Sequence, residues 1–296
     1  AIDADNIYEI PLLLHNQDFD AMVMDMLNLE KTNEPDLQEW TTYLQRSKSP
    51  LKKIEVALVG KYVGHKDAYL SVKEAIGHAA VVNDAEVHIR YVEAEEVERI
   101  GVDALKGVNA ILVPGGFGRR GIEGKIAAAR YARENSIPYL GLCLGMQIAV
   151  IEFARNVCSI VSAHSSEFDP GTPNPVIHLL EEQRGIASVG GSMRLGAYPC
   201  EIKKDTLAYR VYRSSMVYER HRHRWEFNND YRNRLEREGL IVSGVCPDRN
   251  LVEIVELRDH PWFVGVQFHP EFKSRPTRPH PLFASFIEAA VKNCQG

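Results

Sequence analysis

The sequence feature that most constrains the fold is an apolar run that leads into a cysteine between two glycines. Residues 138–147 read Pro-Tyr-Leu-Gly-Leu-Cys-Leu-Gly-Met-Gln. This pattern is typical of a strand that turns sharply into a helix, where side chains in place of the glycines would block the turn. Such an elbow lifts its central residue clear of the sheet, and the positive end of the helix dipole favours a cysteine thiolate. The pattern therefore predicts that Cys143 is an exposed, activated nucleophile.

A cysteine in an apolar run is more often a small buried hydrophobe, but the flanking glycines and the helical run at 146–153 favour the nucleophile. A thiol nucleophile also needs a base and a group that orients the base, which can lie far away in sequence. Residues 262–271, Trp-Phe-Val-Gly-Val-Gln-Phe-His-Pro-Glu, read as a buried strand that ends in His269 and Glu271. Residues two apart in an extended segment point the same way. We therefore expect Glu271 to orient the His269 imidazole, as the acid does in a catalytic triad.

From residue 54 onward, apolar runs alternate with helical ones. Strands are predicted at 54–60, 86–92, 110–113 and before Cys143, with helices at 69–82 and 125–134. This alternation predicts an α/β fold with a mostly parallel sheet flanked by helices, and with sites at the carboxyl ends of the strands. From Glu167 the pattern becomes β-rich, with strands at 220–227, 240–245 and 251–257 and a short helix at 231–239. These segments predict a smaller antiparallel β extension.

Residues 1–50 do not follow this alternation and are predicted to form a helical run to about Leu29, an aromatic patch at Trp40 and Tyr43, and a linker. We therefore divide the chain into residues 1–50 and a domain at 51–296. The start of the chain lacks the basic and apolar regions of a signal peptide, and the apolar stretch at 140–151 is too short to span a bilayer.

Composition limits the function classes. The 296 residues are 45% hydrophobic and 25% charged, which gives room for a large core, and a net charge of −5 predicts neither nucleic acid nor membrane as a partner. The five cysteines lack a Cys-x-x-Cys pair, which predicts a reducing compartment, the cytoplasm by default, and no structural metal. His221 and His223 form a His-x-His pair, a weak metal signal without a third ligand.

The motifs carry a family resemblance. Residues 114–116, 141–147 and 267–271 are similar to the motifs of class I, triad-type glutamine amidotransferases. Within that family, residues 115–118, 120–125, 166–168, 190–196 and 219–224 resemble the glutaminase domains of CTP synthases. The resemblance runs from about residue 54 to the C-terminus. One departure is Ser-Ala-His-Ser-Ser-Glu at 162–167, where Asn-Ala-Asn-Ser-Thr-Glu is more usual, and it leaves Glu167 in place.

The resemblance implies that Cys143 attacks the side-chain amide of L-glutamine and that His269, oriented by Glu271, protonates the ammonia and then activates water against the thioester. The backbone N–H groups of Gly116 and Leu144 would hold the oxyanion. The residues implied to bind glutamine are Gly116, Leu144, Gln147, Glu167 and Arg224. A carboxylate suits the α-ammonium group, and a guanidinium suits the α-carboxylate.

Two glycine-rich, cationic segments resemble the region that binds the effector GTP, although plain surface turns are the alternative. The residues concerned are Phe117, Arg120, Gly121, Glu123 and Arg194. The resemblance further implies a synthetase domain in the same polypeptide that uses ATP and Mg²⁺ to aminate UTP, no cofactor in this chain, and a homotetramer at full length. Residues 1–50 resemble the end of that domain and its linker. Without an initiator methionine or a phosphate loop, the chain is expected to be a fragment.

Two other interpretations stay open at this point. One is a different amidotransferase or a γ-glutamyl hydrolase, in which the β-rich insert would bind a folate tail. The other is a non-catalytic assembly or nucleotide-sensing module with an unused triad. The presence of Cys143, His269 and Glu271 together argues against that module, because no structural requirement explains all three.

Overall fold

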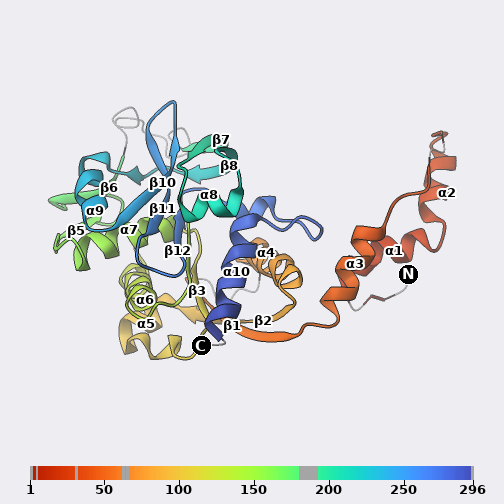
Figure 1. Cartoon of the computed structure of the whole chain (residues 1–296), viewed down its shortest axis with the longest axis horizontal. Coiled ribbons are helices and arrows are strands. Elements are labelled where there is room, and N and C mark those ends of the chain that lie inside the picture. The colour runs from red at the N-terminus through yellow and green to blue at the C-terminus, as the bar shows by residue number, and fades with distance from the viewer. Residues whose placement is uncertain are drawn as a thin grey trace.

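The structure of the chain, a computed structural model, describes residues 3–4, 6–30, 33–61, 64, 67–179 and 193–294 (Figure 1). The strands are β1 (Lys52–Gly60), β2 (Ala85–Glu93), β3 (Ala110–Val113), β4 (Tyr139–Leu142), β5 (Ala163–Ser165), β6 (Asn174–His178), β7 (Arg194–Ile202), β8 (Met216–His223), β9 (Glu226–Phe227), β10 (Leu240–Cys246), β11 (Leu251–Leu257) and β12 (Phe263–Val266). The α-helices are α1 (Ile10–His15), α2 (Phe19–Met26), α3 (Gln38–Ser47), α4 (Leu70–Val82), α5 (Ala94–Ile100), α6 (Ile122–Glu134), α7 (Leu144–Asn156), α8 (Leu207–Tyr212), α9 (Arg232–Arg237) and α10 (Pro281–Cys294). Short 3-10 helices lie at η1 (Ile7–Glu9), η2 (Val102–Leu105), η5 (Asn229–Tyr231) and η6 (Pro270–Lys273).

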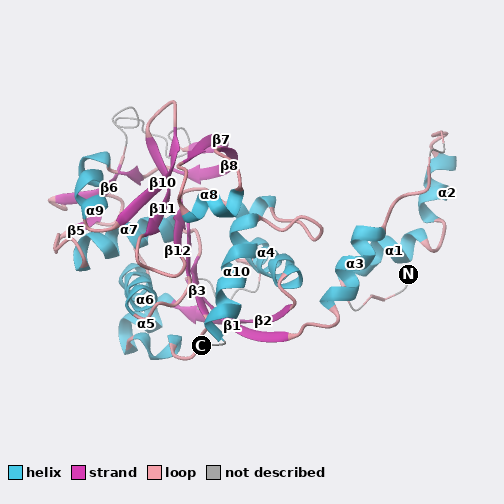
Figure 2. Ribbon diagram, viewed as in Figure 1, coloured by secondary structure: helices cyan, strands magenta, loops and turns pink. Residues whose placement is uncertain are grey.

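Most of these strands belong to one twisted sheet, which runs through the centre of the body (Figure 2). Its order is β2-β1-β3-β4-β12-β11-β10-β7-β8. The strands from β2 to β12 are parallel, and β11, β10, β7 and β8 continue the sheet in antiparallel pairs. A second sheet, β5-β6-β9, is mixed. The predicted α/β fold is confirmed, and the antiparallel extension continues the main sheet.

Helices cover both faces of the parallel half because its strands are apolar on both sides. In β1, Ala57 and Val59 pack with α5, α6 and α7, whereas Val56 and Leu58 pack with α4 and α10. This alternation follows from the two-residue period of a strand. In Figure 1, α5 and α6 accordingly lie on the opposite side of the strands from α4 and α10.

The position of β12 brings the two ends of the predicted triad together. Although β12 lies more than a hundred residues after β4 in the sequence, the two strands are parallel neighbours, with Val266 opposite Leu142. The residues that follow both strands therefore leave the same edge of the sheet. Cys143 follows β4, and its N–H donates to the carbonyl of Val266 at 2.7 Å.

The N-terminal helices α1–α3 extend from the body on the side of α4 (Figure 1). The helical run predicted to about Leu29 is divided into α1 and α2 by a turn at Asn16–Asp18, where Asp18 has a left-handed φ of 54°. A small apolar cluster of Tyr43, Leu44 and Val81 joins α3 to α4. Within the described ranges, no helix has the length and apolar character needed to cross a membrane.

Candidate active site

The cysteine elbow has a backbone conformation that rarely suits a side chain. Cys143 lies between β4 and α7 with φ 51° and ψ −99°. A Cβ atom on Gly145 would lie 2.2 Å from the carbonyl oxygen of Val113, and one on Gly141 would lie 2.5 Å from the carbonyl carbon of Gly145. These neighbours are backbone atoms of packed elements, so they cannot move aside. The two glycines are therefore required for the elbow to form against β3.

The Cys143 side chain is only 4% exposed, so the prediction of an exposed thiol is wrong in this respect. The cysteine lies on the wall of a pocket of about 240 Å³. The other chemistry-bearing or aromatic residues that line this pocket are Asp67, Tyr69, Ser71, Phe117, Arg222, His269, Glu271 and Phe272. A recessed thiol of this kind is reached through the pocket and is otherwise shielded from water.

His269 and Glu271 follow β12 and line the same pocket as Cys143. The Nδ1 atom of His269 is 2.7 Å from a carboxylate oxygen of Glu271, which is itself buried. Within the described residues, the Nε2 atom of His269 has no hydrogen-bond partner. Phe272 stacks on the imidazole, with ring centroids 5.5 Å apart. The ring is thus held on one edge by the carboxylate, and the other nitrogen is left to exchange a proton.

The charge state of His269 depends on its two partners. Burial by itself lowers the pKa of His269, but the negative charges of Cys143 and Glu271 together raise it to about 10. The imidazolium form is therefore favoured at neutral pH when the sulfur is a thiolate. A histidine charged in this way can act as the proton donor in the step that follows attack by the sulfur.

A segment after β3, residues 115–118, is called the glycine strip here, and its first three residues form another wall of the pocket. A Cβ on Gly115 would lie 2.8 Å from Cε1 of His269, so the strip passes directly over the imidazole. The next residue, Gly116, lies against the side chain of Leu144, because its Cβ would be 3.5 Å from Cδ2. Leu144 is the first residue of α7, so its N–H has no acceptor within the helix. The structure thus brings together the two residues predicted to form the oxyanion hole.

The family of this chain follows from its similarity to known proteins. The sequence matches the family Glutamine amidotransferase class-I over residues 65–289. The chain belongs to the class I glutamine amidotransferases. A solved relative is the glutaminase domain of Trypanosoma brucei CTPS with bound acivicin, which is 42% identical, has a TM-score of 0.77 and covers 81% of this chain and 94% of that chain.

Curated relatives of this amidotransferase are CTP synthases. The CTP synthase of Caldanaerobacter subterraneus is 59% identical over 290 residues, and that of Bacillus velezensis is 55% identical over 291 residues. Each match covers 98% of this chain and 54% of the relative. The chain therefore spans about half the length of the curated relatives that it matches.

The three side chains predicted to bind glutamine, those of Gln147, Glu167 and Arg224, lie on different segments, and none of them lines the pocket that holds Cys143. Gln147 on α7 is buried, and its Nε2 donates to the carbonyl of Trp225 at 2.9 Å. Glu167 accepts a hydrogen bond from the N–H of Gly118 at 3.1 Å, and burial raises its pKa. The Nε atom of Arg224 is buried without a partner among the described residues. A buried, unpaired guanidinium nitrogen is a group that an anionic ligand can satisfy.

The residues predicted for the effector region do not gather at one point. Phe117 lines the pocket, Arg120 donates to the carbonyl of Lys61 at 3.0 Å, and Gly121 is the N-cap residue of α6 with a φ of 70°. Glu123 pairs with Arg155 at 2.8 Å. Arg194 lies in the interior instead, where its guanidinium pairs with Glu226 at 3.1 Å and Glu253 at 2.8 Å. Residues 190–192 of the second predicted segment lie outside the described residues.

Two side chains contribute to the site although no role is predicted for them from the sequence. Lys61, after β1, is buried, and its Nζ donates to the carbonyls of Phe117 and Gly118, which fixes the glycine strip. Gln267 has its Nε2 at 3.8 Å from the sulfur of Cys143. Its Oε1 accepts from Nε2 of Gln147 at 3.3 Å, which orients the amide so that an N–H faces the sulfur. Gln267 lies within the recognised 267–271 motif, but only the fold reveals its contact.

The histidines of β8 alternate with arginines, with Arg220 and Arg222 exposed and His221 and His223 buried. His221 lies 2.6 Å from Glu253, and His223 lies 2.7 Å from Glu226. The described part of the chain holds no group of three His, Cys, Asp or Glu side chains arranged for a metal ion. These histidines therefore belong to the same buried charge network as Arg194.

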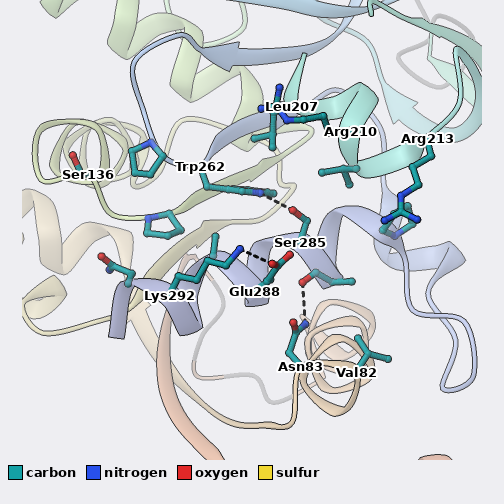
Figure 3. Close-up of a pocket in the computed structure, with 17 residues that line it drawn as sticks. Val82, Asn83, Ser136, Leu207, Arg210, Arg213, Trp262, Ser285, Glu288 and Lys292 are labelled. Atoms are coloured by element: carbon teal, nitrogen blue, oxygen red, sulfur yellow. Dashed lines mark hydrogen bonds and ion pairs between the residues drawn. The ribbon is translucent and has the colours of Figure 1, made fainter. Parts of the chain in front are cut away.

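A larger cavity of about 700 Å³ lies at the other end of the sheet, between α8 and α10 (Figure 3). It borders Pro138 and Trp262, which precede β4 and β12, whereas Cys143 and His269 follow those strands. In Figure 3 the indole N–H of Trp262 donates to Ser285, and Lys292 pairs with Glu288. Size alone therefore does not identify the site, because the smaller pocket holds the cysteine.

Replacing Lys125 by methionine is expected to stabilise the fold, most strongly below neutral pH. The Lys125 side chain is 2% exposed on α6, and burial together with repulsion from Lys61 lowers its pKa from 10.5 to about 7. Between pH 7 and pH 10.5 the unfolded chain binds more protons at this residue than the folded chain does. The destabilisation caused by burying the Lys125 charge is therefore complete below pH 7 and disappears as the pH rises towards 10.5. We expect Lys125→Met to raise the Tm by about 3–8 °C at pH 6 and by less at pH 9. Thermal melts at both pH values test this, with exposed Lys203→Met as the unchanged control. A Tm gain at pH 6 that is equal to or smaller than the gain at pH 9 would contradict this prediction.

Proposed function

We propose that this chain is the glutamine-hydrolysing part of a CTP synthase. The observation that carries the proposal is the position of Cys143, on a strained elbow that shares a pocket with the paired His269 and Glu271. The arrangement occurs in a chain of the class I amidotransferase family whose curated relatives are CTP synthases. A buried thiol next to a histidine–carboxylate pair suits acyl transfer through a thioester.

The reaction begins when the Cys143 thiolate attacks the carboxamide carbon of glutamine. The oxyanion that forms is stabilised by the N–H groups of Gly116 and Leu144, and one such donor is worth about 3–4 kcal/mol in comparable sites. As the C–N bond breaks, the His269 imidazolium gives its proton to the leaving ammonia. The neutral imidazole then takes a proton from water, which attacks the γ-glutamyl thioester and releases glutamate and the thiolate. Glu271 holds the ring through both transfers.

We assign recognition of the amino-acid end of glutamine to side chains that do not line the pocket of Cys143 in this structure. The Glu167 carboxylate suits the α-ammonium group, and the Arg224 guanidinium suits the α-carboxylate. The unpaired Nε of Arg224 supports this role, because a substrate carboxylate would supply its missing acceptor. The Nε2 of Gln147 is already used by Trp225 and Gln267, so this residue offers the substrate its carbonyl oxygen.

In the whole protein, we propose that the ammonia passes to a synthetase domain that uses ATP and Mg²⁺ to convert UTP to CTP. The names and lengths of the curated relatives support this, since this chain matches about half of each. GTP as an effector at the glycine strip and a homotetrameric full-length enzyme belong to the same proposal. A cytoplasmic location agrees with five free cysteines.

The test is glutamate and ammonia release from L-glutamine by the 296-residue chain, with and without GTP. Acivicin, which is bound in the Trypanosoma brucei domain, serves as a covalent probe of the nucleophile. Activity and labelling should be lost in Cys143→Ser and kept in Cys294→Ser, a matched control at an exposed cysteine. Absence of glutamate in all conditions, together with no label on Cys143, would overturn the proposal in favour of a non-catalytic module.

A further inference from the structure

A chain of hydrogen bonds connects the N-terminal segment to the loop that carries the catalytic carboxylate. Tyr8 in η1 has its hydroxyl 2.5 Å from a carboxylate oxygen of Glu74 and 2.8 Å from Nε2 of His78, both on α4. The Nδ1 atom of His78 lies 3.1 Å from the hydroxyl of Ser274. Three segments that are distant in sequence therefore meet at a single buried histidine, which is 5% exposed.

The direction of each hydrogen bond follows from the carboxylate, which can only accept. The Tyr8 hydroxyl donates to Glu74 and must therefore accept from Nε2–H of His78. Nδ1 of His78 is then an acceptor, and the Ser274 hydroxyl donates to it. Ser274 in turn accepts the N–H of His280 at 3.2 Å. This tautomer is neutral, which agrees with a pKa of His78 that burial lowers.

Ser274 ends the short helix that holds Glu271. It is the C-terminal cap residue of η6, whose first turn contains Glu271 and whose N-cap is His269. On its other side, η6 is held by Lys273, which donates to the carbonyl of Tyr218 at 2.6 Å. A short 3-10 turn has little internal stability, so its position depends on contacts of this kind, which also include the N–H of His269 donating to the carbonyl of Arg220 at 2.8 Å. The bond from His78 to Ser274 is thus one of the contacts that place Glu271 against His269.

The other end of the chain is fixed by the N-terminal helices. The indole N–H of Trp40 on α3 donates to the carbonyl of Tyr8 at 2.6 Å, and the ring of Tyr8 packs edge-on against Tyr43. Lys48 pairs with Glu9, the residue after Tyr8, at 2.6 Å. The position of Tyr8 therefore follows that of α3. Helix α4 itself reaches the catalytic pocket, because Leu70 to Val72 at its start line it.

We propose that Tyr8, His78 and Ser274 are positioning residues for glutamine hydrolysis, through which the N-terminal segment sets the placement of Glu271. A shift of α1–α3 would move Tyr8, weaken the bond from His78 to Ser274 and loosen η6. The nucleophile would then face a histidine that is no longer held in one orientation. As a link to a synthetase domain, this inference rests on the proposed function, since residues 1–50 are proposed to be the end of that domain.

The test compares Tyr8→Phe and Ser274→Ala, singly and together, in the full chain. Each change removes a hydroxyl and keeps the rest of the side chain, so folding should be retained and is checked by Tm. We expect each single variant to lower kcat roughly 5- to 20-fold with KM changed less than twofold, the loss typical of one hydrogen bond. The double variant should lose no more than the worse single one, because both changes cut the same connection.

A structural role alone would not move two further readouts. Loosening Glu271 lowers the pKa of His269, so the fall of activity at high pH should begin at a lower pH in both variants. Alkylation of Cys143 by iodoacetamide at pH 7 should slow as well, and it needs no glutamine, so it still tests the connection if the wild-type chain releases no glutamate.

Tyr231→Phe removes a hydroxyl that bonds Asn174 at 3.2 Å and is the unchanged control. Single variants with wild-type kcat and alkylation, or losses that multiply in the double variant, would overturn the inference.

Discussion

Replacing Gly115 by alanine is expected to lower kcat for glutamine hydrolysis roughly 10²- to 10³-fold while the fold survives, since a displacement of about 1 Å at a reacting group costs rate on this scale. The added Cβ would lie 2.8 Å from Cε1 of His269 and 3.6 Å from Cβ of Cys143. Its nearest neighbour is a side-chain ring, not backbone, so the imidazole can move away. That movement changes the position of Nε2 relative to the sulfur of Cys143, and the cost falls on activity instead of on folding.

The measurement is kcat and Tm for Gly115→Ala beside Gly77→Ala. Gly77 lies within α4, and a Cβ there would meet nothing within 4 Å, so this variant changes the same atoms where there is space. It should keep wild-type kcat. If Gly115→Ala retained more than about a tenth of wild-type kcat, the close approach of the glycine strip to His269 would not govern the orientation of the ring.

The sequence predicts the parts of this molecule that depend on local pattern. Glycines at 141 and 145 predict the elbow because only a residue without a Cβ fits against Val113 and the following turn. The alternation of arginines and histidines in β8 predicts that they lie on opposite faces, since a strand has a fixed two-residue period. The pairing of Cys143 with His269 was predicted from motifs and the family resemblance, and in the structure it results from the adjacency of β4 and β12.

Contacts between distant segments were not predicted from local pattern. Lys61 reads as a charged residue after a strand, yet the fold buries it under the glycine strip, where carbonyls accept its protons. His78 reads as part of a helix, and its two partners are 70 and 196 residues away. Arg194 was predicted to be available to a phosphate, whereas two glutamates from other strands hold it in the interior. In each case, the partner is chosen by tertiary packing, which a single sequence does not reveal.

Replacing Glu271 by glutamine should lower kcat by about 10²–10⁴, because loss of the acid in comparable triads costs up to this much. Glutamine keeps the size and shape of the side chain but removes the charge, so the fold is expected to persist. The carboxylate is 2.7 Å from Nδ1 of His269 and is one cause of the raised pKa of the imidazole, about 10. Without it, the imidazolium that protonates ammonia is less stable.

The pH profile separates this effect from simple misfolding. A raised pKa means that His269 of the free enzyme keeps its proton from neutral pH up to about pH 10, so wild-type kcat/KM should hold through pH 8 and fall as the pH approaches 10. In Glu271→Gln the fall should begin at lower pH, because only the charge of Cys143 still opposes the effect of burial. Glu288→Gln, which removes an exposed carboxylate paired with Lys292 on α10, should match the wild type. A profile for Glu271→Gln that falls at the same pH as the wild type would show that the carboxylate orients the ring without setting its charge.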